Sequence, residues 1–338
     1  MILAEYRAIL AFDHARSRLV ALGRGHDETE ALSNADEAAS WMDAPRPRRA
    51  ARAGPPARSF EPATTDRNYE ACVTDVVARI AAGEIFQANI ARTWIGDLAA
   101  AATPFDVFEP LQRLSPAPFC AFWRLPRLAL VSHSPERFLM IAGDGQSVET
   151  RPIKGTRPRG ETPTIDAALK AELEASEKDR AENLMIVDLM RNDLARVCQA
   201  GEVRVPQLCK IESFEAVHHL VSIVTGRLQP GCDATDLLVA TFPPGSITGA
   251  PKIQAMRVIA AHEPPRGPWC GSLFWAGYDG ALDSSVLIRT AAFVETAAGW
   301  SFRASAGAGI VADSQPMAER LETEIKISGL ARALKGEG

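Results

Sequence analysis

The chain has 338 residues, of which 46% are hydrophobic and 23% are charged. At about 150 residues per domain, this length predicts roughly two domains or one large one, with enough chain to bury a core without a metal or disulfide staple. Acidic residues outnumber basic ones by 42 to 37, and the formal charge of -5 disfavours a general nucleic-acid binder, which normally has a basic excess.

The cysteines and the N-terminus indicate the compartment. The six cysteines form no CxxC pair, which disfavours a zinc ribbon or a redox dithiol, and scattered thiols are typical of a reducing environment. Residues 1–19 lack the continuous apolar core of a signal peptide, and no run of about 20 apolar residues predicts a membrane span. We therefore expect a soluble cytoplasmic protein that binds neither nucleic acid nor a membrane.

The N-terminal region divides from the rest by composition. Residues 8–12 and 18–22 predict two strands around a turn, and residues 29–42 predict a helix. Residues 43–62 contain five prolines and five arginines without an apolar period, which indicates a linker. We expect three parts: a short N-terminal segment (1–42), a linker (43–67) and one globular domain (68–335).

Within that domain, helices and strands follow from hydrophobic periodicity. Helical spacing predicts helices within residues 69–83, 177–198, 247–263 and 315–334. Strand-like segments are 84–96, 121–141, 218–228, 272–280, 284–295 and 300–311. Because the strands follow one another in runs, we expect an α+β fold with largely antiparallel sheets and helices packed outside them.

The common catalytic motifs are missing from the sequence. It contains no GxxxxGK[ST], HExxH or GxSxG, which disfavours a Walker-type phosphate loop, zinc proteolysis and serine-hydrolase chemistry. Four segments rich in carboxylates, lysines and glycines remain as candidates.

The first candidate segment surrounds Lys154, which lies between Arg151 and Arg157. A lysine amine attacks carbon only when neutral, and burial with nearby positive charge favours the neutral form. Lys154 is therefore a candidate nucleophile, and the alternative is an ordinary surface lysine in a basic turn.

Two further segments carry carboxylates on predicted helices. Asp179 and Glu182 share one face of the helix at 177–198, where a partly buried carboxylate needs a cation such as Mg²⁺ or an arginine. Glu319, Glu322 and Lys326 fall on one side of the last helix, which is either a binding face or a solvated face with an ion pair.

The fourth segment is the glycine loop PPGSITGAPK at 243–252. Its glycines let the backbone approach a ligand, and the helix that follows presents free amides to an anion. A purely structural turn is the alternative.

Together these segments resemble the chorismate-utilising enzymes. The matching blocks, in the family's order over residues 70–335, are GEIFQANIART, SPERFL, ETRPIKGTRPRG, AENLMIVDLMRNDLARV, HHLVSIVTGRL, TFPPGSITGAPKIQAM, AGYDG, SSVLIRT, AGAGIVADS and ERLETEIK. The resemblance implies the chorismate-binding fold, which is that of anthranilate synthase component I.

Within this family, PIKGT at Lys154 is similar to the aminodeoxychorismate synthase branch, whereas anthranilate synthases typically carry PIAGT. The resemblance implies that Lys154 attacks C2 of chorismate while Glu136 protonates the departing C4 hydroxyl. Ammonia then adds at C4 and gives 4-amino-4-deoxychorismate for 4-aminobenzoate and folate synthesis. Gln87 stands where isochorismate synthases usually hold a water-activating lysine, which disfavours water as the nucleophile.

The resemblance also implies a metal and a set of binding residues. Mg²⁺ would be held by Glu182 and Glu322, and Arg289 and Lys326 would meet the substrate carboxylates. The other pocket residues that the resemblance implies are Gln87, Thr156, His219, Thr248, Tyr278, Gly307 and Gly309. Because the chain has no recognisable cysteine–histidine glutaminase, we expect a separate glutamine amidotransferase subunit to supply ammonia.

Three expectations remain open at this point. The short region before residue 70 makes tryptophan binding, known in some relatives, doubtful here. An anthranilate synthase component I-like enzyme, in which Lys154 is a bystander, is one alternative function. A non-catalytic chorismate-binding subunit is the other.

Overall fold

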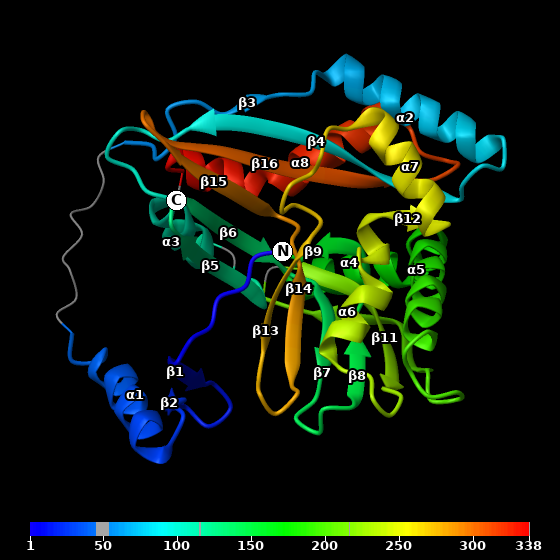
Figure 1. Ribbon diagram of the computed structural model, residues 1–338. Helices are drawn as coiled ribbons and strands as arrows, with labels where there is room; N and C mark the ends of the chain where they lie inside the picture. The colour runs from blue at the N-terminus through cyan, green and yellow to red at the C-terminus, as the bar shows by residue number, and fades with distance from the viewer. Residues whose placement is uncertain (45–53, 115, 216, 338) are drawn as a thin grey trace. The chain divides into compact units, whose positions relative to one another are not determined.

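The computed structural model describes residues 1–44, 54–114, 116–215 and 217–337, and it divides into two compact units, Met1–Ala53 and Gly54–Gly338. In the first unit, β1 (Ala8–Asp13) pairs antiparallel with β2 (Arg18–Gly23), and α1 (Glu28–Ser40) follows (Figure 1). These elements confirm the two strands and the helix predicted from the sequence.

The linker predicted over residues 43–67 is only partly correct. Residues 45–53 lie outside the described part of the chain, but residues 54–67 are docked on the second unit. The Ala57 N–H donates to the Leu334 carbonyl at 2.9 Å, and β3 (Glu61–Pro62) pairs with the strand at Trp94 and Ile95. The prediction was wrong for residues 54–67. Their backbone pairs with β4 without any hydrophobic period, and the prolines in this stretch, which an edge strand tolerates, indicated a loop.

The first sheet of the second unit has seven strands in the order β12-β4-β16-β15-β6-β5, with β3 also on β4. Its other strands are β4 (Gln87–Asp97), β5 (Phe119–Leu125), β6 (Leu128–Ser134), β12 (Gly249–Ala250), β15 (Thr290–Thr296) and β16 (Gly299–Ile310). The helices packed on it are α2 (Asp66–Ala81), α3 (Phe105–Leu114), α7 (Lys252–His262) and α8 (Pro316–Lys335) (Figure 1).

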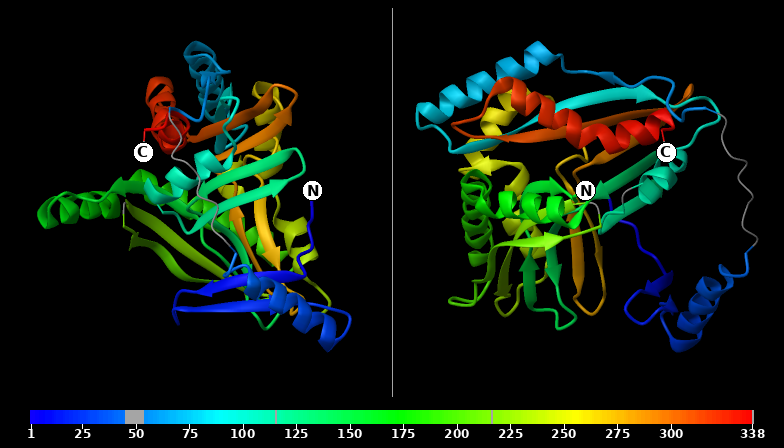
Figure 2. Two further views of the ribbon diagram at one scale, coloured as in Figure 1. Left: turned by 90° about the vertical axis from the view of Figure 1, so that its left-hand side faces the viewer. Right: turned by 180° about the vertical axis from the view of Figure 1, so that it is seen from behind.

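The second sheet also has seven strands, in the order β10-β11-β8-β7-β14-β13, with β9 also on β11. These strands are β7 (Arg137–Ile141), β8 (Ser147–Thr150), β9 (Ile153–Pro158), β10 (Arg204–Ser213), β11 (Val217–Arg227), β13 (Ser272–Ala276) and β14 (Leu282–Val286). Its helices are α4 (Pro163–Ala175), α5 (Glu177–Ala195), α6 (Ala234–Thr241) and the 3-10 turn η1 (Gly245–Ile247). Figure 2 shows both sheets from two further directions.

Every pairing between described strands is antiparallel, which confirms the expected α+β class. None of the helices that the structure describes combines the length and apolar character that crossing a bilayer requires.

The side chains of β4 and β16 alternate between two faces of the first sheet. One face packs against helices, and the other carries the candidate site residues. Ala88 and Ile90 pack with Tyr69 of α2 in one apolar core. Because successive side chains on a strand point to opposite faces, Gln87 and Asn89 lie on the other face. Gly307 and Gly309 share that face, since β16 pairs with β4 in the register Gly307↔Ala91 and Gly309↔Asn89.

Two of the connections that carry the chain between the sheets are neighbours. Glu136 lies between β6 and β7, and Arg289 lies between β14 and β15. The His133 N–H donates to the Arg289 carbonyl and the Val286 N–H donates to the Glu136 carbonyl, both at 3.1 Å, so the two links run side by side. The fold therefore brings an acid and a cation together where the sheets join.

Candidate active site

Lys154 lies on β9, and its side chain is largely buried among polar groups. Its Nζ is 4.0 Å from Oε2 of Glu182 on α5, and the two side chains are 15% and 14% exposed. A Cβ on Gly309 would lie 2.3 Å from Nε2 of Gln87 and 3.4 Å from Nζ of Lys154. A glycine at position 309 therefore leaves room for the amide and the amine in the same pocket.

Gln87 faces this pocket from β4 with spare hydrogen-bonding capacity. Its side chain is 1% exposed, and its Oε1 accepts no hydrogen bond from any described residue. A buried carbonyl oxygen without a donor costs free energy, so the pocket is suited to a ligand that carries an N–H or O–H.

The two arginines beside Lys154 do not act as the sequence suggested. Arg151 donates to Glu212 at 2.5 Å and Arg157 donates to Glu172 at 2.8 Å, so both guanidinium charges are already paired. The positive charge that these arginines could contribute near the lysine is therefore offset by the carboxylates Glu212 and Glu172.

Glu136, which only the family resemblance indicated, is a buried acid near Lys154. Its side chain is 5% exposed, and burial raises its pKa to about 7, against hydrogen bonds from Ser246 and the backbone N–H of Ile153 and the charge of Lys154. A carboxyl that titrates near neutral pH is suited to giving and taking a proton.

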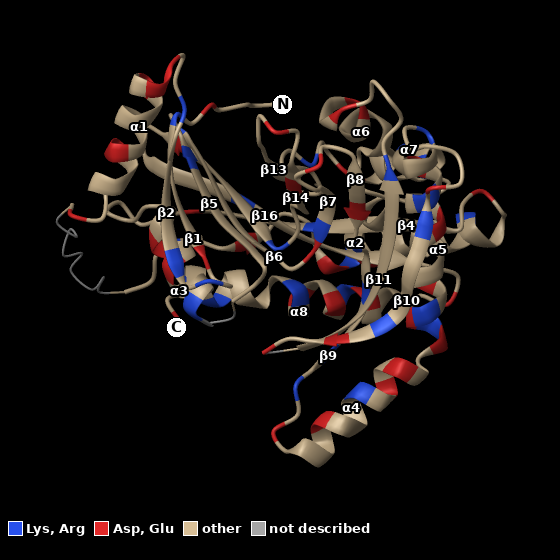
Figure 3. Cartoon of the chain, turned by 90° about the horizontal axis from the view of Figure 1, so that it is seen from below, with Lys and Arg blue, Asp and Glu red and all other residues tan. Residues whose placement is uncertain are grey.

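Three carboxylates from α5 and α8 gather beside Lys154. Lys178 Nζ lies 4.0 Å from Glu182 and 3.9 Å from Glu319, and burial raises the pKa of both acids. Burial tends to raise the pKa of Glu322 as well. Positive charge outweighs this effect and lowers the pKa, chiefly that of Lys326, whose Nζ lies 2.6 Å from Oε1 of Glu322. Figure 3 shows acidic and basic positions interleaved along α8.

The chemistry of these donors fits a hard divalent cation. Glu182 and Glu322 each raise the pKa of a neighbouring acid, so they are close enough to repel one another. In the described ranges, no group of three or more His, Cys, Asp or Glu already surrounds a common point. A pair of carboxylates rather than a full protein cage suits Mg²⁺, which keeps several waters and takes oxygens from its substrate.

Lys326 and Gly307 form the wall next to this cluster. Nζ of Lys326 donates to the Gly307 carbonyl at 2.9 Å. A Cβ on Gly307 would lie 2.7 Å from Oδ1 of Asn89 and 2.9 Å from Cη2 of Trp269, so a larger residue would displace both.

Trp269 is a residue of this wall that the sequence reading missed. It is 6% exposed, and its indole Nε1 donates to no described residue. Its place in the loop PWCG, between a proline and a glycine, was the only local sign of a role. A buried N–H without an acceptor is a ready donor for a ligand.

A further group of expected site residues consists of His219, Thr156 and Arg289. Nδ1 of His219 lies 2.9 Å from Oγ1 of Thr156, and burial, with a smaller effect of the Arg289 charge, lowers the histidine pKa to about 4. Arg289 has φ +50 and forms no ion pair with any carboxylate in the described ranges. A partly buried guanidinium without a counter-ion favours an anionic ligand.

Two other expected pocket residues are Thr248 and Tyr278. The Thr248 hydroxyl donates to the Pro244 carbonyl at 2.6 Å and so holds the glycine loop. Tyr278 is 75% exposed in the turn between β13 and β14. The pocket-wall position expected for Tyr278 therefore stays a prediction.

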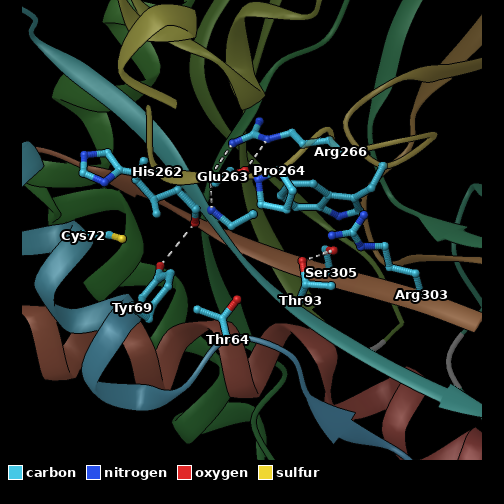
Figure 4. Close-up of a pocket in the computed structure, with 13 residues that line it drawn as sticks. Thr64, Tyr69, Cys72, Thr93, His262, Glu263, Pro264, Arg266, Arg303 and Ser305 are labelled. Atoms are coloured by element: carbon cyan, nitrogen blue, oxygen red, sulfur yellow. Dashed lines mark hydrogen bonds and ion pairs between the residues drawn. The ribbon is translucent and has the colours of Figure 1, made fainter. Parts of the chain in front are cut away.

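A separate small cavity of about 30 Å³ lies beside Trp269, on the same sheet. It has room for about two water molecules, so it is too small for a cyclic diacid. Figure 4 shows the pair of Glu263 and Arg266 at its edge, joined by hydrogen bonds of 2.8 and 2.9 Å.

The protein family and the individual proteins that this chain resembles agree with one another. The family described as chorismate binding enzyme matches residues 2–332. Aminodeoxychorismate synthase component 1 of Klebsiella aerogenes is 48% identical over 266 residues, which cover 77% of this chain and 56% of that protein. The protein of the same name from Bacillus subtilis is 40% identical over 280 residues, which cover 82% of this chain and 58% of that protein. The chain thus spans little more than half the length of these relatives.

Solved structures share the fold. Anthranilate synthase component I from Streptococcus pneumoniae superposes with a TM-score of 0.85 at 28% identity, over 97% of this chain and 72% of that one. The menaquinone-specific isochorismate synthase MenF from Escherichia coli gives a TM-score of 0.74 at 22% identity, over 94% of this chain and 71% of that one. The expected fold is confirmed.

Proposed function

The chain belongs to the family of chorismate binding enzymes, and we propose that it is the chorismate-aminating component of an aminodeoxychorismate synthase. In this role it converts chorismate and ammonia to 4-amino-4-deoxychorismate and water, for 4-aminobenzoate and folate synthesis. The observation that carries the proposal is the largely buried amine of Lys154, which lies 4.0 Å from Glu182 and shares the space at Gly309 with the Gln87 amide. Relatives 40–48% identical that bear this name support it.

In the first step, neutral Lys154 attacks C2 of chorismate. Both ring double bonds shift toward C4, the C4–O bond breaks, and Glu136 gives its proton to the departing hydroxyl, which leaves as water. The new secondary ammonium at C2 then returns a proton to the Glu136 carboxylate. One difficult substitution thus becomes two easier ones.

In the second step, ammonia attacks C4 and both double bonds shift back. The bond between C2 and the lysine nitrogen breaks, and Glu136 protonates that nitrogen as it leaves. The new ammonium at C4 then returns a proton to the Glu136 carboxylate. Two displacements place the amino group at C4, where the hydroxyl was. The pKa of Glu136 of about 7 suits an acid that must be protonated twice in one cycle.

Charged and polar residues around Lys154 account for substrate binding. Lys326 is placed to meet one carboxylate of chorismate and Arg289 the other, with the Trp269 N–H as an additional donor. Glu182 and Glu322 would hold Mg²⁺, which when bound neutralises the ring carboxylate and fixes the orientation of the ring. Burial favours the neutral form of His219, and Thr156 orients its ring through the contact between Oγ1 and Nδ1.

Ammonia in this proposal comes from a glutamine amidotransferase subunit. The name component 1 of the relatives supports a partner of this kind. Ammonium salt should replace the partner in a test tube, because the aminating chemistry uses free ammonia.

The test is the product formed from chorismate, Mg²⁺ and ammonium, followed by addition of the lyase that releases 4-aminobenzoate. We expect 4-aminobenzoate, and intact-mass measurement should detect an adduct on Lys154. Fluorescent anthranilate in its place would show that the chain aminates C2. Binding of chorismate without any turnover would show a non-catalytic subunit.

A further inference from the structure

We propose that Gly155 is a positioning residue for Lys154, because it forms a β-bulge that turns the lysine side chain toward the helices. Its missing side chain also lets α5 lie close to β9, and so sets the distance between the amine and Glu182. This inference rests on the proposed function, since it concerns the nucleophile of the same site.

The bulge lies in β9, where this strand pairs with β11. Lys154 is opposite Leu220. Thr156 is opposite His219, the neighbour of Leu220, so two steps along β9 match one step along β11. Gly155 is the extra residue, and its φ of +75 is the left-handed conformation that glycine takes at such a bulge. Any other residue would be strained there.

The extra residue places Lys154 and Thr156 on opposite faces of the two-stranded ladder. On a regular strand, side chains two positions apart share a face, and directly paired side chains share a face across the strands. Thr156 meets its partner His219, with 2.9 Å between Oγ1 and Nδ1. Lys154 leaves the strand on the face of Leu220, which packs with Leu173 of α4. Without the bulge, Lys154 would share the face of Thr156 instead.

Gly155 also lies against α4 and α5 with no space for a side chain. A Cβ on Gly155 would lie 2.8 Å from Cδ1 of Leu173, 2.9 Å from Cγ of Asp179 and 3.0 Å from Cβ of the same aspartate. Leu173 is fully buried, so it has little room to move aside. The close approach of Gly155 thus fixes how near α5 lies to β9.

This spacing carries over to the carboxylate that faces the amine. Asp179 and Glu182 are three positions apart and share one face of α5. A shift of α5 at Asp179 would therefore also move Glu182. The distance of 4.0 Å between Nζ of Lys154 and Oε2 of Glu182 thus depends on the glycine at 155.

Both effects act on the amine more than on the groups placed to meet the substrate carboxylates. Lys326 lies on α8 and Arg289 lies between β14 and β15, so neither belongs to β9 or α5. A methyl at Gly155 should therefore slow bond formation while chorismate still binds. A displacement of the amine by about 1 Å should lower the rate about 10²-fold.

The experiment compares Gly155→Ala with the wild type in two measurements. Steady-state kinetics use chorismate, Mg²⁺ and ammonium, and quenched intact-mass spectra without ammonium follow adduct formation on Lys154. We expect kcat and the rate of adduct formation to fall about 10²-fold, with KM for chorismate within about threefold. Should the alanine variant fail to fold, Gly155→Asn carries the same comparison, because asparagine takes a positive φ more readily.

Gly201→Ala is the matched control. Gly201 has φ +79, so alanine there meets the same backbone strain, but nothing lies within 4 Å of the added carbon. This variant should lose thermal stability and keep the wild-type kcat, KM and adduct rate.

Three results would overturn this inference alone, each with an active wild type. They are a wild-type kcat and adduct rate in the folded Gly155 variant, a rise in KM without loss of kcat, and an equal loss of kcat in Gly201→Ala. A wild type that forms neither the adduct nor 4-amino-4-deoxychorismate would overturn the proposed function instead.

Discussion

Lys154 and Glu182 face one another across the contact between β9 and α5, with Nζ and Oε2 4.0 Å apart. At this distance the carboxylate attracts the amine without a direct hydrogen bond. The proposed function assigns each group its own ligand, a ring carbon to the amine and a cation to the carboxylate.

Replacement of Lys154 by alanine should remove the covalent route. We expect kcat for 4-amino-4-deoxychorismate to fall on the order of 10⁴-fold or more, as happens when a nucleophile is deleted. Intact-mass measurement should show the chorismate-derived adduct on the wild type and not on Lys154→Ala. Lys170→Ala, an exposed lysine on α4, should keep both the rate and the adduct.

The rate should depend on pH through Glu136. Since this acid acts in its protonated form, kcat/KM should decline as pH rises through about 7, the pKa to which burial raises it. Glu136→Gln should lower kcat by about 10²- to 10⁴-fold and abolish this limb. If kcat/KM of Glu136→Gln still declines as pH rises through about 7, a group other than Glu136 causes that decline.

Stability should depend on the same proton with a defined sign. The folded pKa of Glu136 is about 7 and its ordinary value is 4.5, so between these values the folded state binds a proton that the unfolded state has lost. The free energy of unfolding should therefore fall as pH rises from 4.5 to 7. Glu136→Gln removes this term and should be more stable than the wild type at pH 8, by up to a few kcal/mol, in urea unfolding.

Metal binding should require both proposed ligands. Calorimetric titration with Mg²⁺ should show an affinity at least tenfold lower in Glu182→Gln and in Glu322→Gln than in the wild type. Glu174→Gln, which changes an exposed acid of α4, should bind as the wild type does. Equal affinity in all four proteins would remove Glu182 and Glu322 from the metal site.

A methyl group at Gly309 should block the pocket without unfolding the chain. In Gly309→Ala the added carbon would lie 2.3 Å from Nε2 of Gln87, so the amide must move into the space beside Lys154. We expect kcat/KM to fall about 10²-fold. Gly143→Ala, with nothing within 4 Å of the added carbon, should match the wild type in rate and in melting temperature.

Local periodicity was enough to predict the framework of the site. The helix at Glu177–Ala195 and the strand at Gly299–Ile310 were both evident, because each buries a regular face. The helix at Phe105–Leu114 was not assigned, since Pro110 interrupts it, and the helices at Pro163–Ala175 and Ala234–Thr241 were also left unassigned.

The relations between distant residues were the part that the sequence could not supply. Gly309 and Gln87 are 222 positions apart, and no local pattern pairs them. Trp269 is evident as a candidate only from its buried N–H, which has no acceptor among the described residues. Glu136 came from the family pattern and not from its own sequence neighbourhood.

Two adjacent connections between the sheets keep an acid and a cation at one place. Glu136 and Arg289 sit on these connections, which are joined by two backbone hydrogen bonds of 3.1 Å. The main chain itself therefore fixes the two residues as neighbours. A substitution that shortens either side chain should leave the backbone position of the other residue unchanged.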